Sequence, residues 1–263
     1  MRKNPRYFVF ICFACYHLIF QNEKCIMLNL NFHEMAFFLD FDGTLVGFSA
    51  DPEGVIVSAE LRELLVKLHA KLNGALAIIS GRSIRSLHSL LRLPQISLAG
   101  GHGAEWWFQG ELRQVELNSP NYSVALERIL AFAEKNGLLM ENKTHSCALH
   151  FRRQPDMKTV VDKFIAEHIE TLEGLRVIYG NCVREIQPLG VDKGKAIERF
   201  LKYQPFLGRR PVYIGDDTTD EDAFHWVNVN QGVSFKVGSG MTAAQYRLEN
   251  ITAVMDFLQK VLR

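Results

Sequence analysis

The chain contains little of what would mark a secreted, membrane or nucleic-acid-binding protein. Its 263 residues include only five cysteines, an odd number, so no disulfide framework is indicated and a reduced, cytoplasmic setting is expected. Thirty Lys and Arg residues against 29 Asp and Glu residues leave a formal net charge of +1, which argues against a general nucleic-acid or polyanion binder. Internal repeats, low-complexity tracts and long linkers are also missing. Any anion must therefore be captured by a local site.

Residues 1–34 differ in composition from the rest of the chain. Basic residues at positions 2, 3 and 6 precede a mostly apolar run of 14 residues, 7–20. The run is shorter than the roughly 20 residues that span a bilayer, and the small-x-small cleavage site of a signal peptide does not follow it. We therefore expect an upstream start codon, with initiation at Met27 or nearby, and no membrane association. The Cys12-x-x-Cys15 pair lacks a second ligand pair and is not expected to bind a metal.

Two carboxylates end the apolar run Met35-Ala-Phe-Phe-Leu39, in the order Asp40-Phe-Asp42-Gly-Thr44. The run predicts a buried parallel strand, and alternation would point both aspartates to one face where the strand ends. In an open α/β sheet, ligands bind at that edge. Two carboxylates there can hold a hard cation and leave one oxygen to attack an electrophile. The same Asp-x-Asp-Gly pattern also occurs in calcium loops and plain turns.

Three further segments favour the chemical interpretation over the calcium loop. Ser80-Gly-Arg82 follows the apolar run 75–79, and Gly215-Asp-Asp217-Thr-Thr-Asp220-Glu follows the apolar run 212–214. Lys193-Gly opens a predicted helix over 193–203. Acidic, hydroxyl and cationic groups are thus expected at one sheet edge, a combination that is very improbable by chance.

The order of predicted elements indicates a doubly wound, mostly parallel α/β sheet, because strands and amphipathic helices alternate. Residues 122–187 repeat their own scheme, with helices around Val124, Leu126, Ile129 and Leu130 and around Val160 and Val161. About 65 residues are too many for a simple crossover, so they predict a smaller inserted α/β cap. The predicted parts are an extension at 1–34, core at 35–118, cap at 119–187 and core at 188–263.

At these motifs the sequence resembles the haloacid-dehalogenase-like (HAD) phosphohydrolases, and among them the trehalose-6-phosphate phosphatases. The narrower likeness comes from Gly101-His102-Gly-Ala-Glu105, Glu141-Asn-Lys143 and His150-Phe-Arg152. It extends from about Met35 to the end of the chain. The resemblance implies a Mg²⁺-dependent enzyme that hydrolyses trehalose 6-phosphate to trehalose and phosphate through an aspartyl-phosphate, the last step of trehalose biosynthesis.

The resemblance also assigns roles to the core residues. Asp40 would be the nucleophile, and Asp42 the acid that protonates the sugar oxygen and the base that later activates water. Mg²⁺ would be held by Asp40, the Asp42 carbonyl and Asp216. Asp217 and Asp220 would hold waters or orient Lys193, although acids at the first turn of a helix also serve as caps. The remaining assignments are phosphate binding by Thr44 and Ser80, charge compensation by Lys193, and substrate binding by Arg82, His102 and Glu105. Arg82 could equally pair with an acidic neighbour and stabilise its loop.

The predicted cap residues alternate along two strands. Glu141 and Lys143 would share one strand face, as would His150 and Arg152 on the next strand. Together with Glu185 they resemble the residues with which trehalose-6-phosphate phosphatases hold the distal glucose, although such alternation ordinarily indicates a solvated sheet face.

Two other functions remain open at this point. A related HAD-like phosphatase could act on sucrose phosphate or mannosylphosphoglycerate with the same core. A non-catalytic sugar-phosphate sensor would be expected to lack Asp40, Asp42, Lys193 or Asp216, and all four are present. In every case the partner is a small sugar phosphate. The leading interpretation adds a functional link to a trehalose-6-phosphate synthase.

Overall fold

The computed structural model describes residues 31–47, 54–115, 120–142 and 146–263. Both β-sheets of the described residues lie in one compact unit, His33–Arg263. The expectations for the N-terminal run, its Cys12-x-x-Cys15 pair and Lys143 lie outside the described residues.

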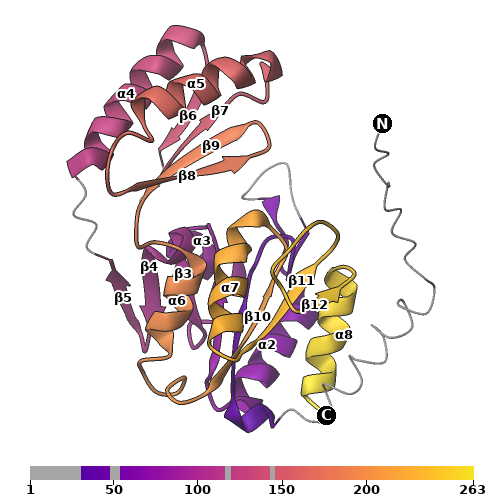
Figure 1. Ribbon diagram of the computed structural model, residues 1–263. Coiled ribbons are helices and arrows are strands. Elements are labelled where there is room, and N and C mark those ends of the chain that lie inside the picture. The colour runs from indigo at the N-terminus through magenta and orange to yellow at the C-terminus, as the bar shows by residue number, and fades with distance from the viewer. Residues whose placement is uncertain (1–30, 48–53, 116–119, 143–145) are drawn as a thin grey trace, which may run out of the picture. The chain divides into compact units, whose positions relative to one another are not determined.

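A mostly parallel sheet of eight strands forms the larger part of this unit (Figure 1), with strand order β12-β11-β10-β1-β2-β3-β4-β5. All neighbouring pairs are parallel except β3 with β4 and β4 with β5. The strands are β1 Met35–Leu39, β2 Leu76–Ile79, β3 Ser97–Gly100, β4 Glu105–Phe108, β5 Glu111–Gln114, β10 Arg210–Gly215, β11 Val233–Val237 and β12 Tyr246–Leu248.

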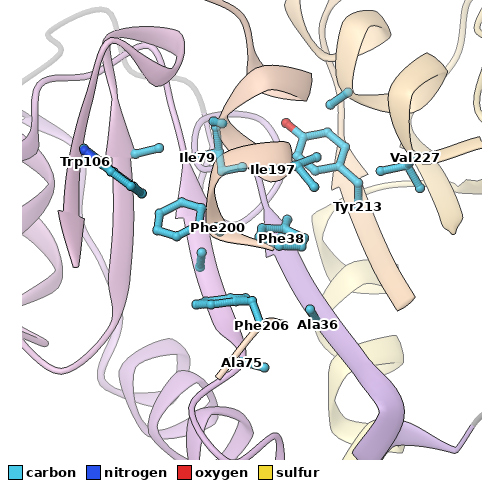
Figure 2. Packing of buried hydrophobic residues seen from close by; sticks show 14 of the residues in the cluster. Ala36, Phe38, Ala75, Ile79, Trp106, Ile197, Phe200, Phe206, Tyr213 and Val227 are labelled. Carbon is cyan, nitrogen blue, oxygen red and sulfur yellow. The ribbon is translucent and has the colours of Figure 1, made fainter. Parts of the chain in front are cut away.

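Helices cover both faces of this sheet. They are α2 Ala59–Lys71, α3 Ile84–Leu91, α6 Lys193–Phe200, α7 Glu221–Val229 and α8 Ile251–Val261. Figure 2 shows Phe38 of β1 beside Phe200 of α6 and Phe206, and the rings of Phe38 and Phe206 stack with centroids 5.4 Å apart. On β11, Ser234 bonds to a side chain of α7 while the next residue, Phe235, contacts Phe257 of α8. Because neighbouring strand residues face opposite ways, α7 and α8 lie on opposite faces.

A smaller antiparallel sheet forms a second layered structure, with strand order β6-β7-β9-β8. Its elements are α4 Pro120–Asn136, β6 Leu139–Asn142, β7 Cys147–His150, α5 Lys158–His168, β8 Leu175–Gly180 and β9 Val183–Pro188. Helices α4 and α5 cover one face (Figure 1), where Ile129, Leu149, Ile165 and Ile186 form a common core. The fold class expected from the sequence, a doubly wound α/β core with a smaller inserted α/β part, is confirmed.

Short segments complete the described chain. The 3₁₀ helices are η1 Phe32–Glu34, η3 Gly101–Gly103, η4 Pro155–Met157 and η5 Thr218–Asp220. Ser58 and Ser83 cap α2 and α3, each accepting a bond from the backbone N–H three residues on. Among the described helices, none has both the length and the apolar character needed to cross a bilayer.

Several local expectations were wrong. Strand β12 was missed, because three residues are too few to show a periodic pattern. Helix α6 ends at Phe200 and not at Tyr203. Of the apolar residues that located α4 and α5 in the sequence, Val124, Leu130 and Val160 are 37%, 47% and 47% exposed. A helix on a two-layer unit needs only one narrow buried stripe, and in α4 that stripe is Ala125, Ile129 and Ala133.

Candidate active site

The candidate site lies at the carboxyl end of the central strands. β1 and β10 are parallel neighbours, and each is followed at once by an aspartate, Asp40 after Leu39 and Asp216 after Gly215. The backbone N–H of Asp40 donates to the carbonyl of Ile214 at 2.9 Å, which extends the pairing of the two strands. The two carboxylates therefore meet because adjacent parallel strands end at the same edge of the sheet.

Lys193 connects Asp40 to a third acid. Its Nζ donates to Oδ1 of Asp40 and to Oδ1 of Asp220, each at 2.6 Å. All three side chains are at most 5% exposed. Lys193 is the first residue of α6, whose N-cap is Asp192. Residues distant in the sequence thus form a buried carboxylate–ammonium–carboxylate bridge, with the charge-assisted bonds that such burial requires.

Asp220 has donors on both of its oxygens. Oδ1 accepts from Lys193 and from the Tyr213 hydroxyl at 2.6 Å, while Oδ2 accepts from the backbone N–H groups of Asp216 and Asp217 at 2.8 Å. Four donors match the roughly four lone-pair sites of a carboxylate. In this structure Asp220 therefore contacts Lys193 and also caps the turn that follows β10, and its role in catalysis stays a prediction.

The neighbouring acids hold the loop in shape. Asp217 is exposed and is the N-cap of η5, where it forms a reciprocal capping box with Asp220. Glu221 accepts from the backbone N–H of Ala243 at 2.7 Å. The structure therefore gives Asp217 a capping position, and Glu221 ties the start of α7 to the loop after β11.

Asp40, Asp216 and Asp220 form a possible cation site. One carboxylate oxygen from each lies within 4.8 Å of the others. Because four donors already occupy Asp220, Asp40 and Asp216 are the side chains suited to bind the ion. Gly43 lies against Asp216, and a Cβ at its position would overlap the Asp216 carboxylate. The oxygen-rich donor set fits a hard divalent cation such as Mg²⁺.

The charge balance of the cluster favours an added cation. Burial and the nearby Asp220 charge raise the pKa of Asp40 well above its ordinary value, and Lys193 only partly offsets them. Burial likewise raises the pKa of Asp216. Burial alone would also raise the pKa of Asp220, but the charge and hydrogen bond of Lys193 outweigh it and lower that pKa. For Lys193, burial would lower the pKa, and the two adjacent carboxylates raise it instead.

Thr44 and Ser80 are both buried beside this edge. The Thr44 hydroxyl donates to Oδ1 of Asp216 at 3.4 Å, a long bond. The Ser80 hydroxyl oxygen accepts from the backbone N–H of Arg82 at 3.1 Å. In this structure the two hydroxyls therefore contact the protein itself, and phosphate binding by either residue stays a prediction.

Asp42 has a different partner from the other acids. Arg82 donates to it through two nitrogens, Nε to Oδ2 at 2.7 Å and Nη2 to Oδ1 at 2.8 Å. Of the two roles that the sequence left open for Arg82, the structure shows the pairing with an acidic neighbour. Asp42 is thus held in a bidentate ion pair, outside the group of acids around Lys193.

His102 and Glu105 follow β3 in the sequence, and each contacts a different part of the structure. His102 has a positive φ of 56°, and its Nε2 lies 3.7 Å from Oε1 of Glu185. Glu105 is buried and accepts from the backbone N–H of Ile84 at 2.6 Å. The observed contact of Glu105 is therefore with the first turn of α3, where a carboxylate also suits the helix dipole.

The smaller sheet brings three of the predicted cap residues to one face. Glu141 pairs with Ala148, and Ala148 pairs with Glu185 across neighbouring strands. Glu141 and Glu185 therefore lie in one row on the same face, with Ala148 between them. His150 lies two residues after Ala148 on the same face, with Nε2 3.1 Å from Oε2 of Glu141. The opposite face carries the core under α4 and α5. Glu185 also accepts from the Ser146 hydroxyl at 2.6 Å.

Arg152 departs from the expected pattern. β7 ends at His150, and Arg152 lies exposed in the turn beyond it. Alternation along β7 therefore does not extend to Arg152, because the strand is shorter than the sequence suggested.

Comparison with known proteins identifies the family. The family model for trehalose-phosphatase matches residues 38–252. A trehalose-6-phosphate phosphatase of Escherichia coli (strain K12) is 36% identical over 230 residues, which cover 86% of this chain and 86% of that protein. A trehalose 6-phosphate phosphatase of Zea mays is 31% identical over 256 residues, covering 87% of this chain and 70% of that protein. The chain belongs to the trehalose-phosphatase family. It is accordingly a phosphoric monoester hydrolase.

Solved structures agree on the fold of this trehalose-phosphatase family member. The C-terminal domain of Candida albicans trehalose-6-phosphate phosphatase superposes with a TM-score of 0.77 at 23% identity, covering 91% of this chain and 96% of that one. A haloacid dehalogenase-like hydrolase from Bacteroides thetaiotaomicron gives 0.64 at 18% identity, covering 87% and 99%. The architecture is therefore that of the HAD-like hydrolases.

Two buried polar residues of this phosphatase were not found by sequence reasoning. Tyr213 lies in the middle of β10 and donates to Asp220. Lys236 lies in β11, and its Nζ donates to the backbone carbonyl of Asp216. Both carried a signal, because a tyrosine or a lysine inside an otherwise apolar central strand needs a buried partner.

Proposed function

We propose that the chain is a Mg²⁺-dependent phosphatase that hydrolyses trehalose 6-phosphate through an aspartyl-phosphate intermediate. The observation that carries this proposal is the bridge in which Lys193 binds both Asp40 and Asp220 at 2.6 Å, with Asp216 adjacent. The substrate is supported by the relatives, which are named as trehalose-6-phosphate phosphatases.

In the first half-reaction, Asp40 acts as the nucleophile. Its Oδ1 is held by Lys193, so we assign the attack to Oδ2. A bond forms between Oδ2 and phosphorus while the bond from phosphorus to the sugar oxygen breaks. Asp42 gives its proton to that leaving oxygen, because an alkoxide is a poor leaving group without one. Trehalose leaves and Asp40 carries the phosphoryl group.

In the second half-reaction, a water attacks the phosphorus of the aspartyl-phosphate. Asp42, now ionised, accepts the proton of that water. The bond between phosphorus and Asp40 breaks, inorganic phosphate leaves and both aspartates return to their starting states. Lys193 stays bonded to Asp40 throughout and keeps the carboxylate in position.

The remaining polar groups would bind the phosphoryl group and the cation. Asp40, Asp216 and the Asp42 carbonyl would hold Mg²⁺, which supplies positive charge against the phosphoryl oxygens. Thr44 would donate to a phosphoryl oxygen after leaving Asp216. Ser80 would donate its hydroxyl proton to another phosphoryl oxygen while its own oxygen still accepts from the Arg82 backbone N–H. Phosphate monoesters hydrolyse so slowly unaided that such combined positioning and charge neutralisation is required.

Residues 119–187 would act as a cap that binds the distal glucose, over a core made of 35–118 and 188–263. The support is the row of Glu141 and Glu185 on one face of the smaller sheet, with the small side chain of Ala148 between them. Carboxylates accept from sugar hydroxyls. Lys143, His150 and Arg152 would complete this set, with His102 and Glu105 reaching the site from the core. Trehalose 6-phosphate would come from a trehalose-6-phosphate synthase, and the enzyme would work in the cytoplasm, where sugar phosphates are made.

The test is phosphate release from a panel of sugar phosphates, with Mg²⁺ or with excess chelator. Trehalose 6-phosphate should be the best substrate, ahead of sucrose phosphate, mannosylphosphoglycerate and glucose 6-phosphate. Asp40→Asn should abolish turnover, and Asp42→Asn should lower it by about 10²–10⁴-fold. Asp256→Asn, on the exposed side of α8, is the matched control. Turnover retained by Asp40→Asn would overturn the covalent mechanism, and a different best substrate would overturn the specificity.

A further inference from the structure

We propose that Arg82 is a latch on Asp42. In the absence of substrate its guanidinium binds the Asp42 carboxylate, and it transfers to the substrate phosphate on binding, which allows Asp42 to face the leaving sugar oxygen. The inference rests on the proposed function, because it takes Asp42 as the group that protonates that oxygen.

The first argument is the geometry of the pair. Nε and Nη2 of Arg82 bind the two oxygens of Asp42 at 2.7 and 2.8 Å, the fork-on-fork arrangement typical of a strong arginine–carboxylate pair. A carboxyl that hands a proton to a leaving group must carry the proton on one oxygen and direct it at the substrate. Neither is compatible with two parallel bonds to a guanidinium. The pair must therefore open in every catalytic cycle that uses Asp42 as an acid.

The second argument is that the side chain of Arg82 can move while its backbone stays in place. The Arg82 backbone is tied at both ends, with its N–H donating to the Ser80 hydroxyl at 3.1 Å and its carbonyl accepting from Gly101 at 2.9 Å. The loop is also packed closely, since a Cβ at Gly81 would lie 2.7 Å from the His102 ring. An arginine has four side-chain torsions, so its guanidinium can move while this backbone stays in place.

The third argument is that a phosphate is the ligand to which this guanidinium would move. Its Cζ lies 5.7 Å from the centre of the Phe41 ring, and Phe41 is the residue between Asp42 and the proposed nucleophile Asp40. A phosphate monoester dianion bound at Asp40 carries about twice the charge of the Asp42 carboxylate, and it accepts the same bidentate fork. The pair is also partly accessible, with side-chain exposures of 13% for Arg82 and 26% for Asp42. Water can therefore reach both groups when the pair separates.

The alternative is that Arg82 and Asp42 stay paired permanently and that Arg82 only positions Asp42. Measurements of ligand affinity can distinguish this alternative from the latch. The full-length chain with Asp40→Asn, which prevents turnover, is combined with Asp42→Ala, with Arg82→Ala and with both. Affinities for trehalose 6-phosphate and for inorganic phosphate are measured by calorimetry with Mg²⁺ present. A latch predicts that Asp42→Ala tightens binding about 3- to 10-fold more when Arg82 is present than when it is absent, because Arg82 no longer has to leave a partner.

The latch would be overturned if Asp42→Ala changed the affinity equally with and without Arg82. It would also be overturned if Asp42→Ala weakened binding in the chain that keeps Arg82. Inorganic phosphate keeps this test independent of the proposed substrate. If the phosphate ion shows the coupling and trehalose 6-phosphate does not bind, the substrate assignment fails and the latch stands.

A second measurement uses Arg82→Ala alone in the active chain and needs no multiple variant. For trehalose 6-phosphate the latch predicts that kcat/KM falls about tenfold, with the whole loss in KM, because Asp42 can reach the leaving oxygen without first being released. A permanent positioning pair predicts a fall in kcat, greater for trehalose 6-phosphate than for p-nitrophenyl phosphate, whose leaving group needs no proton. That kcat pattern would overturn the proposal.

Discussion

Replacing Tyr213 with phenylalanine isolates one hydrogen bond of the buried charge cluster. The ring of Tyr213 is fully buried and packs against Phe224 with centroids 5.6 Å apart, so phenylalanine can keep that packing. The hydroxyl donates to Oδ1 of Asp220 at 2.6 Å. Burial, followed by the nearby charges of Asp220 and Asp40, raises the pKa of Tyr213 well above its ordinary value. The hydroxyl is therefore protonated at neutral pH and acts as a donor.

The expected cost follows from what remains after the change. A hydrogen bond to a charged group contributes about 1.5–3 kcal/mol to stability. Asp220 would still accept from Lys193 on Oδ1 and from two backbone N–H groups on Oδ2, so both carboxylate oxygens would keep a hydrogen-bond donor. We expect Tyr213→Phe to lower the free energy of unfolding by about 1.5–3 kcal/mol. For a chain of this size that corresponds to a fall in Tm of about 3–12 °C.

The assay is equilibrium unfolding in urea, with thermal unfolding as a second probe. Tyr203→Phe is the matched control, because Tyr203 is 40% exposed and its ring lies 5.7 Å from that of Trp106. Turnover by Tyr213→Phe should stay within about tenfold of the wild type, since Lys193 still bridges Asp40 and Asp220. A stability loss no larger than that of the control would refute the energetic reasoning. A loss of turnover as large as that of Asp42→Asn would show that Tyr213 does more than orient Asp220.

The smaller sheet supplies two further predictions. Glu141→Ala and Glu185→Ala should each lower kcat/KM for trehalose 6-phosphate by about 10- to 150-fold and leave p-nitrophenyl phosphate nearly unaffected; equal losses on both substrates would point to damage of the fold. Burial alone would raise the pKa of Asp162, but hydrogen bonds from Lys158 and Arg184 outweigh it and lower that pKa. Its contribution to stability is therefore present above the unfolded pKa of about 4 and is lost as the pH falls through the lower folded value. Asp162→Asn should differ from the wild type in Tm at pH 7 and converge with it in acid, and a difference that does not depend on pH would contradict this assignment.

The sequence by itself determined the main strands and the sheet edge at which the acidic side chains meet. Asp40 follows an apolar run that can only be a buried strand, and Asp216 follows another, so the rule that parallel strands end at one edge brings them together. The helix starts at Ser58 and Ser83 were equally readable, because a cap bonds to its own first turn. These features depend on residues that are close in sequence, so a short stretch of the sequence is enough to predict them.

Tertiary structure decided which charged group pairs with which. Arg82 is separated from Asp42 by 40 positions, and Lys193 from Asp40 by 153. The sequence offers several acids to each cation, and the pairing depends on where the backbone of four separate loops places them. The same holds for Tyr213, whose hydroxyl bonds to Asp220, seven positions further along the chain and beyond the end of β10. Electrostatic and hydrogen-bonding partners are chosen by distances of a few ångströms between remote segments, and only the folded chain sets those distances.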